Sequence, residues 1–372
     1  MPKISLVCHF YNSGKFIPAL IESVLAQDFE DWEIIAVNDC SPGNDLAILE
    51  RYAADPRIKG RLKVIDNPVN LGISKAKEVG WKSSTGKYVM FSDGDDTLEP
   101  HAFSKSFTAA EMYQSDIVIM DVWRVYKLPF HQKKKLSKSS ARYNEIYTKD
   151  SIREELMHSF YGINLLSGVG YWGKLFRRTL LEKSEYVVPK HGFAEDLLFN
   201  LEAFRKAERI VFIDYPAYNW YWGGLTSGSK AKRLNQGKEQ SFYSATSVIE
   251  RYEDLYSYRI KIIESDNLPP ILKKFLIIEL KNVLIAQYAP YSSEKTNHPK
   301  ALQVKNSIRE TISKDAYDIP ESVILQWPEL RNSKGMMELI DKDIDSLYEI
   351  THRIYIGNWK SRLIKSLLSI FH

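Results

Sequence analysis

The chain has 372 residues, which is enough to bury one large core or two moderate ones. Its apolar share of 44% and charged share of 26% are ordinary for a folded protein. The net charge of +4 is small and gives no support to a nucleic-acid partner, which usually requires a concentrated basic face. Two cysteines, Cys8 and Cys40, exclude a disulfide framework, and we expect both to be small buried residues.

The start of the chain enters an apolar, strand-like run at once, without the basic lead and cleavage site of a signal peptide. No window holds about 18 uninterrupted apolar residues, so no membrane-spanning helix is expected. Together these features predict a cytoplasmic protein.

The first hundred residues alternate short apolar runs with helical patterns. The apolar runs predict strands at Ile4–Cys8, Ile34–Val37, Leu62–Ile65 and Tyr88–Ser92. Helical spacing is found between them, at Phe16–Gln27 and at Ser74–Ser83. This order predicts an α/β fold with a mostly parallel sheet and helices on both faces. In such a sheet ligands bind at the carboxyl ends of the strands.

Beyond residue 100 the strand signals are more scattered. Further strands are expected at Ile117–Tyr126, Ile210–Ile213 and Ala217–Trp222. The lysine-rich segment 131–138 is interpreted as a solvated loop, with contact to anionic lipid or diphosphate as the alternative. From about residue 235 long helical patterns dominate, so we predict one domain over residues 1–232 and a helical region over 233–372.

The segment Asp93-Gly94-Asp95-Asp96 follows the strand at Tyr88–Ser92 and places three carboxylates in one turn. Carboxylates this close repel one another, and a divalent cation that prefers oxygen ligands, Mg²⁺ or Mn²⁺, would relieve the repulsion. Such an ion can also hold a diphosphate. An ordinary surface turn is the alternative, but the position at a strand's carboxyl end favours a metal site.

Five ordered blocks resemble the family 2 glycosyltransferases with the GT-A fold, a Rossmann-like α/β fold. The blocks are Ser5–Asn12, Glu22–Gln27, Trp32–Ser41, Asn70–Lys77 and Gly86–Asp96. The resemblance extends over about residues 3–230. It implies an enzyme that transfers a sugar from a nucleotide-sugar donor, with Mn²⁺ or Mg²⁺ as cofactor.

The resemblance also implies which residues bind the donor. The donor-binding positions that it indicates are Phe10, Tyr11, Asn12, Asp39, Asn70, Gly72, Lys77, Asp93 and Gly94. Among them Phe10-Tyr11-Asn12 would pack on the base, Asp39 would hydrogen-bond it, and the base would be uracil. Asp93 would contact the ribose and Asp95 would bind the metal, with Asp93 as a second ligand and Asp96 as a helper.

Two positions depart from the family pattern. The acidic pair after the second strand is Asn38-Asp39 here, which keeps only the residue that contacts the base. The usual Ala-Arg-Asn is Ala76-Lys77-Glu78, so a point charge replaces a bidentate guanidinium. A solvated helix residue is the alternative interpretation of Lys77.

The segment Ala194-Glu195-Asp196 resembles the family's Glu-Asp block, and it implies that Asp196 is the catalytic base. An inverting transfer needs one carboxylate to take the proton of the acceptor hydroxyl. Glu195 and Trp172 would bind the acceptor. The alternative is a helix whose first turn carries acids because they favour the helix dipole.

The segment Tyr218–Ser229 looks like the end of the family's catalytic domain. Trp222 stands near the position where the family has a basic residue. Thr226, Ser227, Ser229 and Lys230 are expected to form a glycine-hinged lid. The aromatic residues of this segment could form a sugar platform or pack the edge of the sheet.

The tail at residues 352–371 is basic and amphipathic, with Trp359, Leu363, Leu367 and Ile370 on one helical face. Such a helix could lie on an anionic membrane surface or dock on protein, and a second copy of the chain stays open as a partner.

The prediction for the whole chain is an inverting, metal-dependent transfer from a UDP-sugar to a glycan or lipid-linked glycan in bacterial surface-glycan synthesis. The alternatives are a nucleotidyltransferase, which would normally show a glycine-rich phosphate loop in place of His9–Gly14, and a non-catalytic glycan-binding protein.

Overall fold

The computed structural model describes residues 1–127, 132–138, 142–152, 170–184 and 195–222, with short helical pieces at 257–258, 260–261 and 264. The chain divides into two compact units, Met1–Ser241 and Phe242–His372. The fold and the site below belong to the first unit. The predicted boundary near residue 232, the lid and the tail at 352–371 lie outside the described residues.

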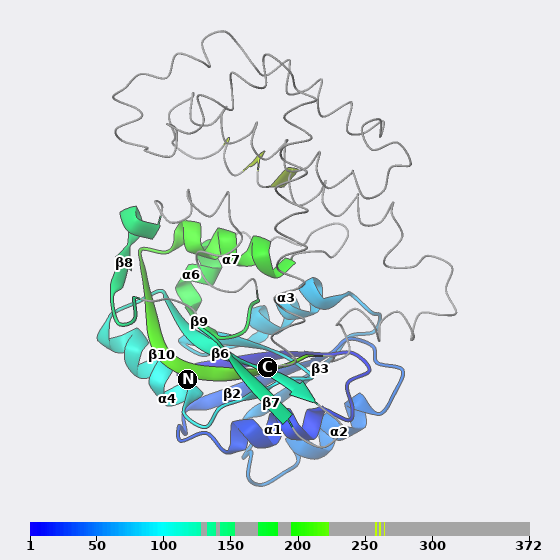
Figure 1. Cartoon of the computed structure of the whole chain (residues 1–372). Helices are drawn as coiled ribbons and strands as arrows, with labels where there is room; N and C mark the ends of the chain where they lie inside the picture. Colours follow the sequence, from blue (N-terminus) through cyan, green and yellow to red (C-terminus); the bar gives the residue numbers. More distant parts are fainter. Residues whose placement is uncertain are drawn as a thin grey trace, which may run out of the picture. The chain divides into compact units, whose positions relative to one another are not determined.

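Four parallel strands form the first half of the sheet. They are β1 (Ile4–Phe10), β2 (Trp32–Asn38), β3 (Leu62–Asp66) and β4 (Tyr88–Asp93), in the order β3-β2-β1-β4 (Figure 1). Every residue of β1 except His9 is buried, because helices cover both faces of the sheet. The predicted α/β fold with a mostly parallel sheet is confirmed.

The second half of the sheet is mixed. β9 (Lys174–Arg177) lies antiparallel between β4 and β6 (Ile117–Lys127), and β10 (Arg209–Trp222) runs parallel to β6. The short β5 (Thr97–Leu98) closes the path beside β10, and β8 (Ile146–Thr148) pairs with the start of β10. The two strands expected at 210–213 and 217–222 are one strand with irregular register between Ile213 and Tyr218.

The lysine-rich segment interpreted as a loop contains a strand, β7 (Gln132–Ser137), which pairs antiparallel with Val122–Lys127 of β6. That interpretation was wrong for residues 132–137. Lysines are typical of edge strands, where their charge discourages pairing with a second sheet.

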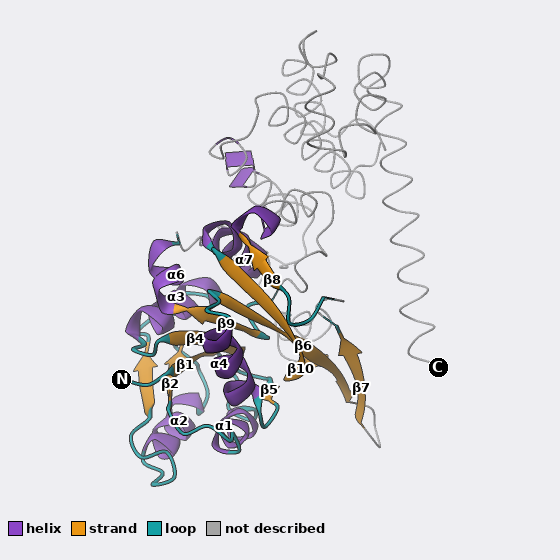
Figure 2. Cartoon of the chain, turned by 90° about the vertical axis from the view of Figure 1, so that its left-hand side faces the viewer, coloured by secondary structure: helices purple, strands orange, loops and turns teal. Residues whose placement is uncertain are grey.

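In the part of the chain that the structure describes, six helices flank the sheet. They are α1 (Ile17–Leu25), α2 (Asp45–Ala53), α3 (Ile73–Ser83), α4 (Ala102–Met112), α6 (Arg178–Lys183) and α7 (Glu195–Lys206). Figure 2 shows α1, α2 and α4 on one face and α3, α6 and α7 on the other. None of the helices in the described part of the chain is long and apolar enough to cross a membrane.

Two kinds of packing hold the helices of the second face. Gly80 lets α3 approach the sheet, because a Cβ there would lie 2.5 Å from Val7 Cγ1. At the other side, Phe199 of α7 packs on Phe91, Phe176 and Tyr171, with ring centroids 4.8 to 5.4 Å apart. Both α3 and α7 are therefore fixed against the same region of the sheet.

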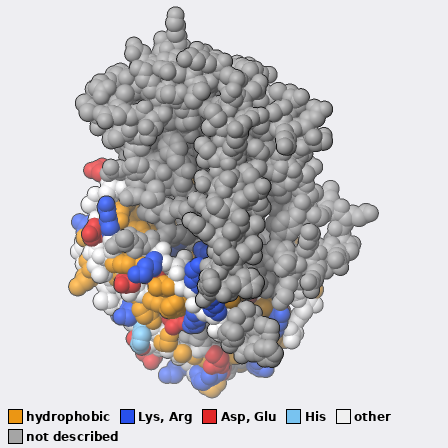
Figure 3. All heavy atoms as spheres, viewed as in Figure 1, with side chains coloured by type: hydrophobic (Ala, Val, Ile, Leu, Met, Phe, Trp, Pro, Cys, Tyr) orange, Lys and Arg blue, Asp and Glu red, His pale blue; other side chains and the backbone are white. Residues whose placement is uncertain are grey.

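Charges on the surface are mixed. On the face drawn in Figure 3, lysine and arginine side chains of the described residues are interspersed with aspartate and glutamate. This distribution agrees with the small net charge. The described residues on that face form no concentrated basic area.

Replacing Gly86 with alanine should destabilise the fold. A Cβ at this buried position would lie 2.7 Å from the backbone nitrogen of Ser5, so β1 would have to shift. We expect a loss of about 1–3 kcal/mol in the free energy of unfolding, measured by chemical denaturation. Gly43→Ala is the matched control, because its Cβ would meet neighbours only at 3.6 and 3.7 Å. Equal stability of the two variants would contradict the close packing of β1 against Gly86.

Candidate active site

The register of the parallel strands brings the loops that follow them to one edge. Phe10 of β1 lies opposite Asn38 of β2, and His9 lies opposite Asp93 of β4. The segments after these residues, 11–14, 39–44 and 94–96, therefore meet at the carboxyl edge of the sheet. Most of the predicted donor-binding residues lie here.

Asp39 organises the loop that begins α3. Its carboxylate accepts hydrogen bonds from Asn67 Nδ2 (2.8 Å) and from the backbone nitrogens of Leu71 and Gly72 (2.9 Å each). Burial raises the pKa of Asp39, but His9 and these hydrogen bonds outweigh burial and leave the pKa below its ordinary value. His9 Nε2 lies 3.7 Å from Asp39 Oδ2, which is beyond hydrogen-bond distance.

Asn70 and Gly72 belong to the same structural unit as Asp39. Asn70 Nδ2 donates to the backbone oxygen of Asp39 (3.2 Å). Gly72 has a φ of 81°, in the left-handed region that glycine adopts without strain, and directly precedes α3. Asp39 thus holds two further predicted donor residues, Asn70 through its backbone oxygen and Gly72 through its carboxylate.

The three residues predicted to pack on the base differ in exposure. Phe10 is fully buried, and its ring lies beneath Gly94, where a Cβ would come within 2.6 Å of Phe10 Cδ1. Tyr11 is 44% exposed, and Asn12 is also exposed. In this arrangement Tyr11 and Asn12 offer side chains to a ligand, whereas the ring of Phe10 supports the acidic turn from below.

The acidic turn divides its three carboxylates between two roles. Asp96 is buried and accepts hydrogen bonds from Tyr218 Oη and from the backbone nitrogen of Tyr221, both at 2.8 Å. Burial, reinforced by Asp95 and Asp93, raises its pKa well above the usual value. Asp96 therefore anchors the turn to β10, while Asp93 and Asp95 are partly exposed.

Lys77 is fully buried in α3, which rules out the solvated-helix interpretation. Its Nζ lies 2.6 Å from Asp93 Oδ1 and 4.2 Å from the ring centroid of Tyr171. Burial lowers the pKa of Lys77, but Asp93, Glu195 and Asp196 raise it by more, so the amine stays charged. The position where the family has arginine thus supplies a buried positive charge.

Glu195 and Asp196 form the first turn of α7, where acids also favour the helix dipole. Burial, together with the charge of Asp196, raises the pKa of Glu195 to about 7. Burial raises the pKa of Asp196 to about 6, against the opposing effects of a hydrogen bond from Leu197 N and the charge of Lys77. Because Lys77 attracts both acids as well as Asp93, the fold brings the predicted base and the acidic turn into one electrostatic cluster.

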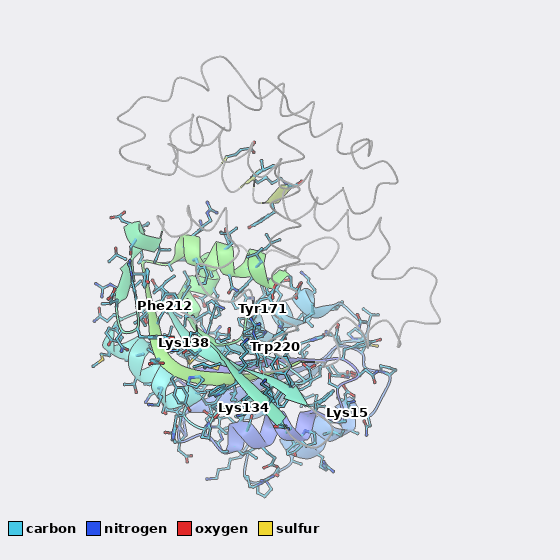
Figure 4. All side chains as sticks on the ribbon, viewed as in Figure 1. Lys15, Lys134, Lys138, Tyr171, Phe212 and Trp220 are labelled. Carbon is cyan, nitrogen blue, oxygen red and sulfur yellow. The ribbon has the colours of Figure 1, made fainter. Side chains whose placement is uncertain are left out.

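Trp172 lies in an aromatic stack. Its ring is parallel to those of Tyr218 and Trp220, at interplanar angles of 9° and 18° and centroid distances of 5.6 and 5.8 Å (Trp220 is labelled in Figure 4). Tyr218 also touches the acidic turn, because Asp93 N donates to its Oη at 3.0 Å. The side chain of Trp222 and the lid residues Thr226, Ser227, Ser229 and Lys230 lie outside the described residues.

Sequence reasoning missed one buried amine near the predicted base. Lys174 is 1% exposed, and burial lowers its pKa to about 7 despite the attraction of Asp196. The signal in the sequence was its position two residues after Trp172, a predicted acceptor-binding residue. Its burial depends on β9 lying in the middle of the sheet, which local patterns do not reveal.

The acidic turn supplies only part of the ligand set that a divalent cation needs. In the described part of the chain no group of three or more His, Cys, Asp or Glu residues is arranged to hold a metal. Asp93 and Asp95 offer two partly exposed carboxylates, which fit Mg²⁺ or Mn²⁺ when phosphate and water oxygens complete the coordination. Asp96 does not fit, since both its oxygens accept hydrogen bonds from β10.

Glu195→Gln should stabilise the protein above neutral pH. A carboxyl whose pKa rises on folding stabilises the fold below its unfolded pKa, near 4.5, and loses that stability as the pH rises through the folded value of about 7. The amide has no charge to bury, so we expect a melting temperature at pH 8 that is higher by about 2–4 °C, with little change at pH 4. Glu50→Gln is the control, because Glu50 of α2 is exposed. A melting temperature that falls at pH 8 would contradict the burial of this charge.

Comparisons with known proteins agree with this geometry. Residues 5–183 match the family model described as glycosyl transferase family 2. The chain is 28% identical over 329 residues to the glycosyltransferase EpsJ of Bacillus subtilis (strain 168), covering 88% of each protein. It is 28% identical over 222 residues to the poly(ribitol-phosphate) beta-N-acetylglucosaminyltransferase TarS of Staphylococcus aureus (strain MW2), covering 59% of this chain and 35% of TarS.

Solved structures show the same fold. Residues 1–349 of S. aureus TarS, in complex with UDP-GlcNAc, superpose with a TM-score of 0.63 at 19% identity, over 95% of this chain and 92% of that one. The family match, the sheet order and the acidic turn after β4 lead to one conclusion: the chain is a glycosyltransferase with the GT-A fold, and its residues 5–183 match family 2.

Proposed function

We propose that the enzyme transfers a sugar from a UDP-sugar to a hydroxyl group of a glycan, with inversion at the anomeric carbon, in the synthesis of a bacterial surface glycan. The observation that carries the proposal is the cluster around Lys77. One buried ammonium attracts Asp93, in the turn that would hold the donor, and Glu195 and Asp196, in the helix that would carry the base. This brings the proposed donor site and the proposed base close together, and a single displacement would place them on opposite faces of the anomeric carbon.

On the donor side, Tyr11 and Asn12 offer exposed side chains for the base and ribose. Asp39 would contact the uracil while it holds the loop at Asn70 and Gly72. Gly94 allows the turn to lie close to Phe10 and the backbone of His9, and Lys77 fixes the Asp93 carboxylate that would meet the ribose. A UDP donor is supported by the similar TarS chain, which has been crystallised with UDP and with UDP-GlcNAc.

Asp95 and Asp93 would hold Mn²⁺ or Mg²⁺. When bound there, the ion would supply positive charge that stabilises the departing diphosphate. Asp96 would keep this pair in place through its hydrogen bonds to β10. Lys77 supplies a second, permanent positive charge close to Asp93.

On the acceptor side, Asp196 would remove the proton. The acceptor oxygen bonds to the anomeric carbon, the bond from that carbon to the diphosphate oxygen breaks, and the hydroxyl proton passes to the Asp196 carboxylate. A base with a pKa of about 6 is ionised at neutral pH and still accepts a proton well. Glu195 would orient the acceptor, and the ring stack of Trp172 would offer it an apolar surface.

The class of acceptor rests on the relatives. TarS is named for poly(ribitol-phosphate), and a second relative, 29% identical over 239 residues, is the cholesterol galactosyltransferase of Borreliella burgdorferi. A glycan or lipid-linked glycan acceptor agrees with the Trp172 stack. A lid at Thr226–Lys230 and membrane contact through the tail remain predictions.

Asp196→Asn should abolish transfer and preserve donor binding. The amide cannot take the proton, so we expect kcat for release of UDP from UDP-GlcNAc to fall by about 10²–10⁴-fold. The affinity for UDP, measured by calorimetry, should change little because Asp196 lies on the acceptor side. Glu202→Gln, a buried acid further along α7, is the control for changes in the helix itself. Turnover retained by Asp196→Asn would move the base to another residue.

A further inference from the structure

Lys174 is a buried cation that the proposed mechanism does not use. It lies on β9, and its side chain is 1% exposed. Phe176, two residues further along the same strand, packs on Phe199 of α7 with ring centroids 5.3 Å apart. Because alternate residues of a strand share a face, Lys174 is on the side of β9 that α7 covers. Burial of an ammonium is costly unless it has partners, so its surroundings are informative.

The Lys174 ammonium is joined to the helix that carries the predicted base. Lys174 Nζ donates to the backbone oxygen of Gly170 at 2.8 Å. The same oxygen accepts a hydrogen bond from Asn200 Nδ2 at 3.0 Å. Asn200 follows Asp196 by four residues in α7, which places the two on the same side of the helix. One carbonyl oxygen therefore links the β9 lysine to the base helix.

The charge of Lys174 also acts on Asp196. Asp196 is attracted by Lys77 from α3 and by Lys174 from β9, and it is repelled by Asp93 from β4. Its neighbour Glu195 is subject to the same burial and to repulsion from Asp196 and Asp93. The two lysines therefore offset part of the negative charge of three buried or partly buried carboxylates, Asp93, Glu195 and Asp196.

We propose that Lys174 is a positioning residue for Asp196. Lys174 holds α7 through the Gly170 carbonyl, and its charge favours the ionised form of the Asp196 carboxylate. This inference rests on the proposed function of Asp196 as the base. It assigns no contact between Lys174 and either substrate.

The protonation of Lys174 fits this role. Burial lowers its pKa to about 7, and burial raises that of Asp196 to about 6. Each group favours the charged form of the other, because the Lys174 ammonium and the Asp196 carboxylate attract each other. The other charged groups of the cluster, Lys77, Asp93 and Glu195, are the same in the variants below.

Three variants of the full chain separate the charge from the hydrogen bond. Lys174→Met removes both, Lys174→Gln keeps a donor without charge, and Lys174→Arg keeps the charge. The exposed Lys63 on β3 gives the matched control, Lys63→Met. The measurement is the pH profile of kcat for hydrolysis of UDP-GlcNAc with Mn²⁺, together with calorimetric affinity for UDP.

We expect the acidic limb of the profile to move upward by about one pH unit in Lys174→Met and Lys174→Gln, because a charge within the protein is lost. Lys174→Arg should restore the position of the limb, and UDP affinity should stay within about threefold of wild type. If Lys174→Gln keeps the wild-type profile and only Lys174→Met loses thermal stability, the lysine has a structural role alone and the proposal is overturned.

A second readout does not need activity. The carboxyl pKa of Asp196 can be followed by carbon-13 NMR, with the signal identified by its absence in Asp196→Asn. The pKa of Asp196 should rise by about one unit in Lys174→Gln. An unchanged pKa overturns the inference even if Lys174→Met does not fold. Failure of wild-type protein to bind UDP or hydrolyse UDP-GlcNAc, with the pKa shift present, would count against the proposed function and leave the Lys174–Asp196 coupling standing.

Discussion

Lys77 carries a positive charge that is buried between α3 and β4, and the arrangement of the site depends on it. Its Nζ lies 2.6 Å from Asp93 Oδ1, and its field reaches Glu195 and Asp196 at the start of α7. Removing one partner of a buried ion pair commonly costs about 3–5 kcal/mol, because the other charge stays behind without compensation. The carboxylates on both sides of the proposed reaction centre are therefore held by a charge that the chain itself provides.

The residues that hold α3 and the acidic turn around Lys77 come from distant parts of the sequence. Asp39, after β2, fixes the start of α3 by accepting hydrogen bonds from Leu71 and Gly72. Gly80 lets the same helix lie close to β1 and β2, since a Cβ would touch Val7 and Val37. Asp96 and Tyr218 hold the acidic turn from the side of β10. Lys77 is therefore carried by a helix that is held both at its start and along its buried face.

Local sequence patterns predict the parallel half of the fold well, and they predict less of the site. β1, β2 and β4 are buried on both faces, so each is a short apolar run that stands out between helices. β7 was missed because its lysines resemble a solvated loop and its pairing with β6 is a tertiary effect. The burial of Phe10, Lys77 and Lys174 could not be predicted either, because it depends on which helix covers which strand. The resemblance to a family indicated Asp93 and Asp196, but their shared field is visible only in the structure.

The most direct test of the donor site is a calorimetric titration of UDP, GDP and CMP into the full chain, with and without Mn²⁺, repeated with Asp95→Asn. We expect UDP to bind and GDP and CMP not to bind. Mn²⁺ should strengthen the binding of UDP by about tenfold or more, and Asp95→Asn should lose most of this gain. Binding of GDP or CMP in place of UDP would contradict the role given to Asp39. A folded protein that binds none of the three would contradict the catalytic account and favour a glycan-binding protein.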